Sequence, residues 1–535
     1  MPEVIFKYTA MKNLFFFLCF TLIYISLNAQ NYLNQKYDRQ RIIMDRISGG
    51  CYNLDPNDTV YKIGTLFDFN DDTLRMQAID TFINQNIPVK YWTYGNNAQI
   101  CDTAGRIAAY FNGSQLWDRY GNAILLEVFG YFQPFPYSSK YSYNNAIILP
   151  VPDKQDEFIL ICVNDYQMEG LPYNSIAPEG LTSVRFKLLP DGRLSIGTIV
   201  PSILKDKLPF FGVLSACRHA NGRDWWIVAP RRFSKDMHSF LLSPDTLKYI
   251  GIQTLKDTII DQAIVPMFAP DGNWYARGET YKHVSMYEKL NRGQTIPFDR
   301  CSGTFGDPIT FKLPYEDTSS LSQIIYSKSS KYFYLINTLT IWQGESDAPD
   351  PLKSLIRVCR YDPKIVDYGY YLVFGMAFLA SDGKIYVFDG RNNFRVTVIN
   401  NPDERGMACD ARYASIMKPS CTGGSLGNMP DFNLGPLDGS PCDTLGLDAT
   451  INTYRPQATV PLSIYPNPSP GSFTVLIPSQ QGVLRLSDAR GMPIRAIAVH
   501  DFQMKVNIAL PPGIYIATYT SADGKIMTSG KVVVE

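Results

Sequence analysis

The stretch Ser381-Asp382-Gly383-Lys384-Ile385-Tyr386-Val387 joins a tight polar turn to a run of strand-forming residues. Asp and Gly supply the positive φ angles and local hydrogen bonds that close a hairpin, and β-branched and aromatic residues favour the strand that follows. The same arrangement recurs along the chain at Ala104-Gly105-Arg106, Asn221-Gly222-Arg223, Pro270-Asp271-Gly272 and Lys328-Ser329-Ser330-Lys331, and more loosely at Pro152-Asp153-Lys154.

The spacing of these turns predicts a repeat architecture. Between Gly105, Lys154, Gly222, Gly272, Ser330 and Gly383 the separations are 49, 68, 50, 58 and 53 residues. A period of roughly fifty residues suits a four-stranded propeller blade, so the middle of the chain has room for about seven blades. A chain of β-sandwiches is the alternative, because such turns occur in any β protein.

Composition agrees with an all-β fold and excludes two classes of protein. The chain has 535 residues, too many for one small core, and its 50 basic and 50 acidic residues balance. Nucleic-acid binding needs a basic excess, so we expect no nucleic acid among the partners. Apolar residues make up 45% and aromatic residues 13% of the chain, which argues against disorder.

The first residues predict export. Lys12 precedes an apolar run from Leu14 to Leu27, and Asn28-Ala29-Gln30 offers a small residue at a cleavage point. This pattern is typical of a signal peptide over residues 1–29, with Met11 as the true start and the Sec machinery as the partner. The run is shorter than the roughly 20 apolar residues of a transmembrane helix, and we expect no transmembrane segment in the mature chain.

The remaining chain divides into three parts by composition. Residues 30–448 form the propeller-like domain, 449–461 read as a linker, and 462–535 read as a small Ig-like β-sandwich. Nine cysteines remain after the signal peptide, and an oxidising compartment permits disulfides. Cys409, Cys421 and Cys442 cluster where a disulfide would help, whereas Cys162 and Cys217 read as buried apolar residues.

The last domain carries a specific motif. It combines a Pro-bounded first strand, a following turn and a late buried strand, through Tyr465, Pro466, Asn467, Pro468, Gly471, Phe473, Asp488, Gly491, Gly513, Ile514 and Tyr515. Over its whole length this domain resembles the type A sorting domain of the type IX secretion system. The acidic end at Glu535 departs from the family, many of whose members end near a basic residue. An ordinary β-sandwich binding module is the alternative.

The resemblance implies an address read by the type IX translocon, with removal of the domain after transport. We therefore expect export across both membranes to the cell surface or the extracellular space. Stretches such as His219–Trp226, Val398–Pro402 and Leu434–Asp443 also resemble a group of secreted propeller-like proteins of the same bacteria. No chemistry is assigned to that group, so nothing about activity follows from it.

The strongest concentration of functional residue types lies between Arg218 and Arg232. Here His219, Asp224, Trp225, Trp226 and Arg231 form a candidate ligand-binding site, in which a tryptophan stacks on a sugar and Arg231 contacts an anion. The alternative is structural: alternation buries one tryptophan between blades while Arg218 and Asp224 pair at a turn.

Motifs for metal, nucleotide and acyl-transfer chemistry are missing from the sequence, so we expect no cofactor and no metal. Asp68, Asn70 and Asp72 begin like a calcium loop, but Thr73 and Ile79 replace its glycine and closing glutamate. The sequence thus favours a secreted propeller that binds an extracellular glycan or protein. A polysaccharide hydrolase or lyase on the same scaffold is the alternative, and an adhesin-like role lacks the long repeats it would need.

Overall fold

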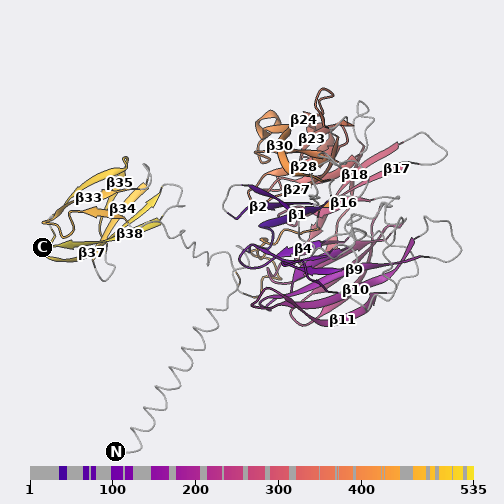
Figure 1. The fold of residues 1–535 in the computed structure, drawn as a ribbon, viewed down its shortest axis with the longest axis horizontal. Helices are drawn as coiled ribbons and strands as arrows, with labels where there is room; N and C mark the ends of the chain where they lie inside the picture. The colour runs from indigo at the N-terminus through magenta and orange to yellow at the C-terminus, as the bar shows by residue number, and fades with distance from the viewer. Residues whose placement is uncertain are drawn as a thin grey trace, which may run out of the picture. The chain divides into compact units, whose positions relative to one another are not determined.

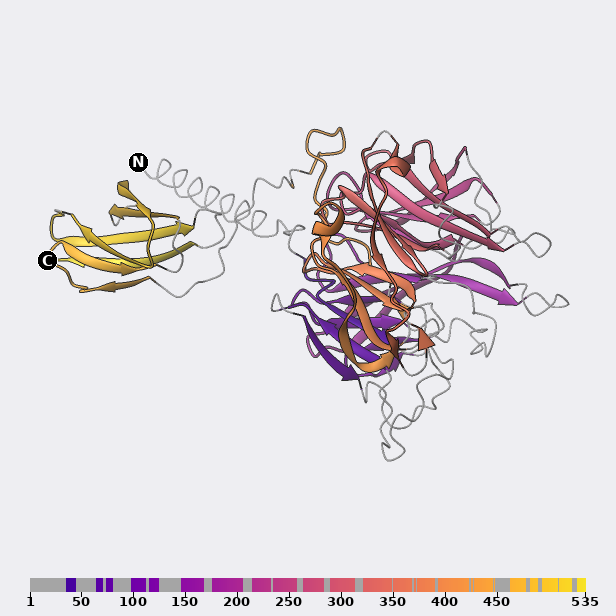
Figure 2. The ribbon, with the colours of Figure 1, turned by 90° about the horizontal axis from the view of Figure 1, so that it is seen from above.

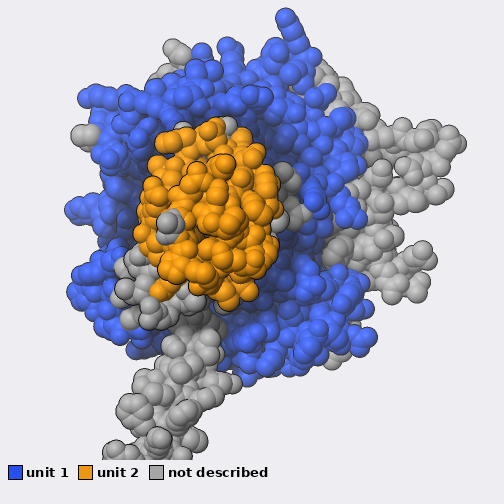
Figure 3. All heavy atoms as spheres, turned by 90° about the vertical axis from the view of Figure 1, so that its left-hand side faces the viewer, with its two compact units in different colours: residues 1–449 blue, residues 450–535 orange. Residues whose placement is uncertain are grey.

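The chain divides into two compact units, residues 1–449 (unit 1) and residues 450–535 (unit 2), coloured separately in Figure 3. The structure is a computed structural model that describes residues 35–447 and 462–535 with gaps, the longest being 45–63, 80–97 and 125–145. The predicted signal peptide lies outside the described residues. Among those residues, no helix has the length and apolar character needed to cross a membrane.

Unit 1 is built from small antiparallel sheets in which most strands pair with the next strand along the chain (Figure 1). The predicted all-β class is therefore confirmed. The first half holds three sheets of four strands. The first contains β4 (Ala98–Cys101), β5 (Ile107–Phe111), β6 (Leu116–Asp118) and β7 (Ala123–Ile124), and the second contains β8 (Ala146–Pro150), β9 (Glu157–Gln167), β10 (Ile176–Leu188) and β11 (Leu194–Leu204). The third contains β12 (Ser215–Arg218), β13 (Trp225–Pro230), β14 (Asp236–Leu242) and β15 (Leu247–Thr254).

The second half continues this pattern with three larger sheets and a two-stranded one. They are β16 (Ala263–Phe268), β17 (Trp274–Lys282), β18 (Lys289–Asp299), β19 (Thr304–Phe305) and β20 (Ile309–Lys312); β21 (Leu321–Tyr326), β22 (Tyr332–Asn337), β23 (Thr340–Glu345) and β24 (Ile356–Arg360); β25 (Val366–Asp367) and β26 (Tyr370–Tyr371); and β27 (Phe374–Leu379), β28 (Ile385–Asp389), β29 (Asn393–Ile399) and β30 (Ala411–Thr422). Two short 3₁₀ helices accompany them, η1 (Pro351–Ser354) and η2 (Gly406–Cys409).

One sheet joins the two ends of unit 1. Its strands are β1 (Gln40–Met44), β2 (Gly64–Asp68), β3 (Arg75–Ile79) and the late strand β31 (Ser425–Leu426), in the order β3-β2-β1-β31. Ile43 lies opposite Leu426, and Met44 lies opposite Ser425. In Figures 1 and 2 the early strands accordingly lie beside the late strands of the unit.

The first strands of successive sheets lie next to one another. β1 contacts β4, and β4 contacts β8. Further along the chain, β12 contacts β16, β16 contacts β21, β21 contacts β27, and β27 contacts β31. Between β8 and β12 the Asn428 side chain makes the connection, because its Nδ2 donates to the carbonyls of Ala146 (3.0 Å) and Leu214 (2.9 Å). A side-chain amide here satisfies backbone acceptors that would be costly to bury unpaired.

The cores of unit 1 lie between neighbouring sheets. One large hydrophobic cluster joins the three sheets that begin at β4, β8 and β12, and further clusters join each following pair up to the sheet of β27. The series returns to its start: Phe67 on β2 packs with Phe378 and Phe388, and Ile42 on β1 packs with Ile107 on β5. Every sheet of the series is thus held by two neighbours.

The repeated turns lie between the first and second strands of their sheets. Gly105, Gly222, Gly272 and Gly383 have φ between +73° and +82°, and Ser330 has φ +60°. In the looser copy the positive φ falls on Asp153 rather than on Lys154. These turns need the left-handed conformation that glycine adopts at little cost, which explains their residue choice.

Unit 2 consists of two antiparallel sheets that share one core. The three-stranded sheet contains β32 (Ser463–Tyr465), β33 (Ser472–Leu476) and β36 (Gln503–Asn507), and the four-stranded sheet contains β35 (Pro493–Val499), β34 (Gly482–Asp488), β37 (Gly513–Ser521) and β38 (Met527–Val534). Phe473 and Val506 of the first sheet pack against Leu484, Ala517 and Val532 of the second. This is the packing of a small β-sandwich.

Candidate functional site

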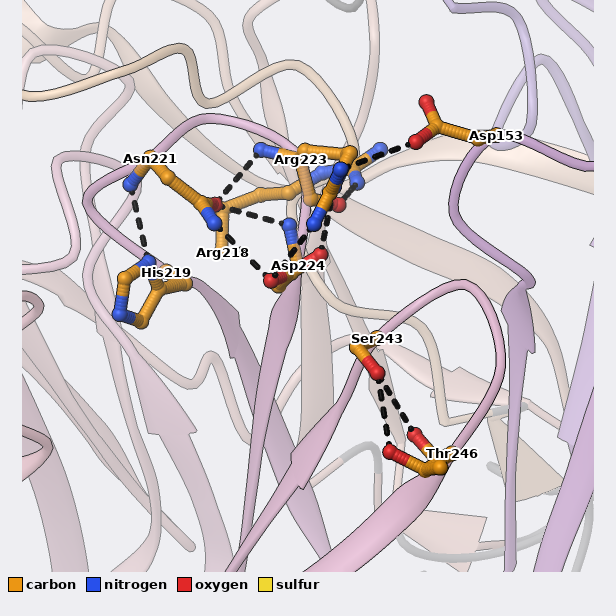
Figure 4. A network of polar contacts seen from close by, with 8 residues as sticks. All are labelled: Asp153, Arg218, His219, Asn221, Arg223, Asp224, Ser243 and Thr246. Atoms are coloured by element: carbon orange, nitrogen blue, oxygen red, sulfur yellow. Dashed lines mark hydrogen bonds and ion pairs between the residues drawn. The ribbon is translucent and has the colours of Figure 1, made fainter. Parts of the chain in front are cut away.

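The turn between β12 and β13 carries two of the five predicted ligand-binding residues, His219 and Asp224 (Figure 4). Asn221 organises it, because its Oδ1 accepts from the backbone N–H groups of Arg223 and Asp224, both at 3.0 Å. Its Nδ2 donates to Asp224 Oδ2 at 2.9 Å, and its own N–H donates to Nδ1 of His219 at 3.0 Å. The side chains of His219 and Asp224 are therefore engaged in holding the turn.

Arg223 extends this network to the neighbouring sheet. Its Nε donates to Asp224 Oδ1 at 2.8 Å, and its Nη1 donates to Asp153 Oδ2 at 3.0 Å in the turn after β8 (Figure 4). Asp153 is 45% exposed, so the outer ion pair contributes at most about 1 kcal/mol. The pairing expected between Arg218 and Asp224 was wrong in its choice of arginine, since Arg223 is the residue that pairs with Asp224.

Arg218 is buried and lies flat over a tryptophan. Its guanidinium carbon is 3.9 Å from the ring centroid of Trp225, its Nη1 donates to the Arg223 carbonyl at 2.5 Å, and its Nη2 donates to Gln35 Oε1 at 2.9 Å. A desolvated cation over an indole face gains about 2 kcal/mol. Arg218 thereby joins the segment that precedes β1 to the sheet of β12.

Both predicted tryptophans are buried, where the sequence alternative expected one. Trp225 packs edge-on against Phe432 at 5.8 Å, and Trp226 donates its Nε1–H to the Arg300 carbonyl at 2.8 Å. The His219 ring lies 5.5 Å from that of Trp226, and burial lowers the pKa of His219, so this imidazole is neutral at pH 7. These contacts fill the spaces between sheets.

The fifth predicted residue, Arg231, lies at the other end of β13. Its Nη1 pairs with Asp236 Oδ2 at 3.2 Å across the β13–β14 hairpin. A hydrogen bond from Thr254 and the Arg231 cation hold the pKa of Asp236 below its usual range. The structure therefore brings four of the five residues together and places Arg231 apart from them; their ligand-binding role stays a prediction.

A segment that follows β31, Asp431–Asp443, lies across this turn; we call it the covering segment. The N–H of Leu437 donates to the carbonyl of Ala220 at 2.9 Å, and Arg300 donates to the carbonyl of Gly435. A Cβ placed on Gly222 would come within 2.7 Å of Pro436, so the covering segment needs glycine there. The covering segment, which comes from the end of unit 1, thus covers the turn of residues 219–224.

A disulfide fixes the covering segment. Cys442 pairs with Cys301, which follows β18, with 5.5 Å between the Cα atoms and 141 residues between them in sequence. The expected cluster of Cys409, Cys421 and Cys442 therefore contains only one partner of this bond, because Cys409 is a buried free cysteine and the Cys421 side chain is outside the described residues. Cys162 and Cys217 are buried, as predicted.

Two carboxyls that the sequence analysis did not single out lie at the same end of unit 1. Asp38 precedes β1 and Asp431 follows β31, and antiparallel pairing of those strands brings them together. Desolvation raises the pKa of Asp431 to about 6 although its side chain keeps contact with solvent, and it also raises the pKa of Asp38. Asp38 acts on Asp431 in the same direction, while Lys328 opposes the shift. No local motif marks this pair, because 393 residues separate its members.

The calcium-like start of Asp68 and Asn70 has a local role. Asp68 Oδ1 accepts from the backbone N–H and from Nδ2 of Asn70, both at 2.9 Å, which makes an Asx turn at the end of β2. Asp72 is outside the described residues. Within the described part of the chain, no group of three His, Cys, Asp or Glu side chains is placed to hold a metal ion.

The motif of unit 2 ties its first strand to its last. Asn467 Nδ2 donates to the Lys531 carbonyl at 2.7 Å, and Asn467 Oδ1 accepts from the Val533 N–H at 2.8 Å. The side-chain amide thus pairs with the edge of β38 like a backbone unit, beside Pro466 and Pro468, which have no N–H to offer. The motif begins the sandwich by protecting an edge strand.

Other motif residues divide into buried and exposed sets. Phe473 is in the core, Tyr515 donates its hydroxyl to the Pro511 carbonyl at 2.7 Å, and Gly471 takes φ +94°. Asp488 ends β34, Gly513 begins β37, and Gly491 is outside the described residues. Tyr465 and Ile514 are exposed by 45% and 49%, so folding alone does not account for them.

Comparison with known proteins identifies this unit. Residues 463–535 match the family of the secretion system C-terminal sorting domain, which confirms the type IX sorting domain predicted from the motif. A sorting tail of this kind implies handling by the type IX secretion system and export to the cell surface or the extracellular space. None of the curated proteins matches the chain.

Solved structures with distant likeness come from other bacteria. One is PorZ of Porphyromonas gingivalis, an essential surface component of the type IX secretion system, at 11% identity and a TM-score of 0.34; the alignment covers 89% of this chain but 63%, less than two thirds, of PorZ. Another is the periplasmic gluconolactonase PpgL of Pseudomonas aeruginosa, at 12% identity and a TM-score of 0.33, with 79% and 98% covered. At such scores neither likeness bears on fold or function.

Proposed function

We propose that this chain is an exported cargo whose unit 1 is a closed seven-bladed β-propeller that binds an extracellular glycan or protein. The cyclic series of shared hydrophobic clusters supports closure, because each larger sheet has a neighbour on both sides. The sheet made of β1 and β31 supports it independently: joining the first and last strands of a ring removes its open edge.

The route of export follows from the two ends of the chain. The signal peptide of residues 1–29 directs the chain through the Sec machinery, and the translocon of the type IX system reads unit 2. Removal of unit 2 after transport leaves unit 1 on the surface or free in the medium. An oxidising compartment on this route is consistent with the Cys301–Cys442 disulfide.

The position of the covering segment supports the choice of binding face in this proposal. In a four-stranded meander the connections alternate between two ends, so the turns after the first strands all lie at one end of the proposed propeller. At that end Leu437, Gly435 and the Cys442 disulfide hold the covering segment in place. The opposite end, where the second strands run into the third, is therefore the face for a large ligand.

Glycan arrays and protein capture with the full chain test this proposal. Two variants, each with one added cysteine, carry a bulky polyethylene glycol at opposite ends: Ser329→Cys at the exposed turn after β21, and Lys282→Cys at the far end of β17. Modification of Lys282→Cys should abolish binding, whereas modification of Ser329→Cys should leave it intact. Equal loss from both variants would contradict the choice of face.

The pair Asp38 and Asp431 favours a second candidate, a hydrolase or lyase acting on polysaccharide. Carboxyls with raised pKa values supply a proton donor near neutral pH, and such pairs concentrate at catalytic sites. Polysaccharide degradation by the full chain, lost in Asp431→Asn and in Asp38→Asn, would support this candidate. Unchanged degradation in both variants, or none in the parent chain, would remove it.

A further inference from the structure

Unit 2 exposes more apolar surface than its fold requires. Of the fifteen large apolar side chains that are exposed among the described residues, six belong to unit 2, although it spans only residues 450–535. Single exposed apolar residues are ordinary, but contiguous ones on a sheet face indicate a contact surface. Two of the six, Ile514 and Ile516, lie on β37 of the four-stranded sheet, where the strand register determines their neighbours.

The outer face of the four-stranded sheet follows from alternation. Tyr515, Ala517 and Tyr519 point into the core, so Ile514 and Ile516 of β37 point outward. Ile514 lies opposite Val533 of β38, and Ile516 lies between Ser487 of β34 and Lys531 of β38. We call the set Ile514, Ile516, Val533, Arg485 and Lys531 the isoleucine face.

Within the strands of this sheet, the charged residues of the isoleucine face are positive. Arg485 lies opposite Thr518, two residue pairs along the ladder from Ile516 and therefore on the same face, and both Arg485 and Lys531 are exposed. Asp488 is the one carboxylate residue in the four strands of this sheet, and it lies opposite the inward-facing Tyr515; Glu535 follows the end of β38. A surface that suits it is apolar at its centre and acidic at its rim.

Nothing in the fold of unit 2 accounts for the isoleucine face. The motif residues Phe473, Tyr515 and Asn467 fill the core or close an edge, as described above, whereas Ile514 is half exposed and Ile516 is 38% exposed. The opposite face, on the three-stranded sheet, differs in chemistry: its Tyr465 hydroxyl accepts from Gln503 Nε2 at 3.2 Å. That face provides a matched control.

We propose that the isoleucine face is the surface by which unit 2 docks on the outer-membrane secretion machinery, against an apolar patch rimmed by carboxylates. The proposal rests on the proposed role of unit 2 as the part read by the translocon, and it adds the surface that is read. Apolar contact through Ile514 and Ile516 supplies affinity, and Arg485 and Lys531 orient the domain and speed its encounter with an acidic rim.

Secretion of the full chain by a bacterium with a type IX system tests the proposal. In the variant Ile514→Ser/Ile516→Ser, the fraction of chain outside the cell should fall about tenfold and the chain should accumulate in the periplasm. The control Leu476→Ser/Phe502→Ser removes two exposed apolar residues at the three-stranded sheet, neither of them in the sorting motif, and should be secreted like the parent. Circular dichroism and thermal unfolding of the purified variants verify that unit 2 remains folded.

A charge-reversal variant and a vesicle-binding assay distinguish docking on a protein receptor from docking on a lipid surface. Arg485→Glu/Lys531→Glu should lower secretion at least threefold, and the parent chain should not bind vesicles of phosphatidylethanolamine and phosphatidylglycerol. Vesicle binding that is lost in Ile514→Ser/Ile516→Ser would overturn the proposal in favour of a membrane-binding face. Normal secretion of that variant would overturn it outright, and so would impaired secretion of the control. If the parent chain is not exported at all, the proposed function fails instead.

Discussion

Replacing both cysteines of the disulfide, in the variant Cys301→Ser/Cys442→Ser, should lower the free energy of unfolding of unit 1 substantially. The bond spans 141 residues, a loop that includes β19 to β31 and most of the covering segment. In the chain-entropy model a cross-link of this length stabilises the folded state by about 5 kcal/mol at 25 °C. This loss exceeds that of most single substitutions in a core. The chain near the cross-link has little else to hold it, because β31 joins its sheet through only two residue pairs.

Denaturant unfolding followed by tryptophan fluorescence measures this loss. All six tryptophans of the chain lie in unit 1, at positions 92, 117, 225, 226, 274 and 342, so the signal reports this unit alone. The parent chain in reductant should approach the variant, and reductant should leave the variant unchanged, which controls for the serine substitutions. A variant within about 0.5 kcal/mol of the oxidised parent would refute the reasoning, because the covering segment would then be held without its cross-link.

Three further predictions concern single residues. Gly222→Ala should destabilise unit 1 by at least about 1 kcal/mol, because residue 222 has a φ of +74° and an added Cβ would collide with Pro436. The control Gly439→Ala has the same φ, but its added Cβ would meet no atom within 4 Å, so it should cost less; thermal unfolding of the two variants compares them. Asn467→Ala should cost unit 2 about 1–2 kcal/mol and speed proteolysis of β38, whereas the control Gln503→Ala should not. Because the folded pKa of Asp431 is raised to about 6, the folded state holds its proton more tightly than the unfolded chain, so the contribution of Asp431 to stability is fully present below about pH 4 and is lost as the pH rises through 6. Asp431→Asn should therefore raise the melting temperature at pH 7 more than at pH 4.5, and an equal change at both would contradict the shift.

Local chemistry explains which parts of the fold could be read from the sequence. The turns at Gly222, Gly272 and Gly383 need a left-handed residue wherever they occur, so their spacing marks the starts of sheets. The sorting domain was recognisable because Asn467 and Gly471 serve contacts within one small sandwich. These features depend on residues close in sequence or on a compact motif.

Contacts between distant segments were not predictable. β31 has two residues in a glycine-rich stretch, and only its partner β1, more than 370 residues earlier, makes it a strand. The partner of Cys442 could not be assigned because pairing depends on where the covering segment runs. The candidate site near Trp225 looked like a binding cluster for the same reason: Gln35 and Phe432, which occupy it, come from opposite ends of unit 1.

The sheet that contains β1 and β31 also determines when the fold of unit 1 can be completed. β1 is made early and exposes an unpaired edge until residues 425–426 are available to pair with it, so unit 1 completes this sheet only after nearly all of its length has been made. Any product that stops before Ser425 keeps that edge open and is prone to sticking to other chains. Completion of this one sheet therefore acts as a check on length: only a chain that extends at least to Leu426 can close it.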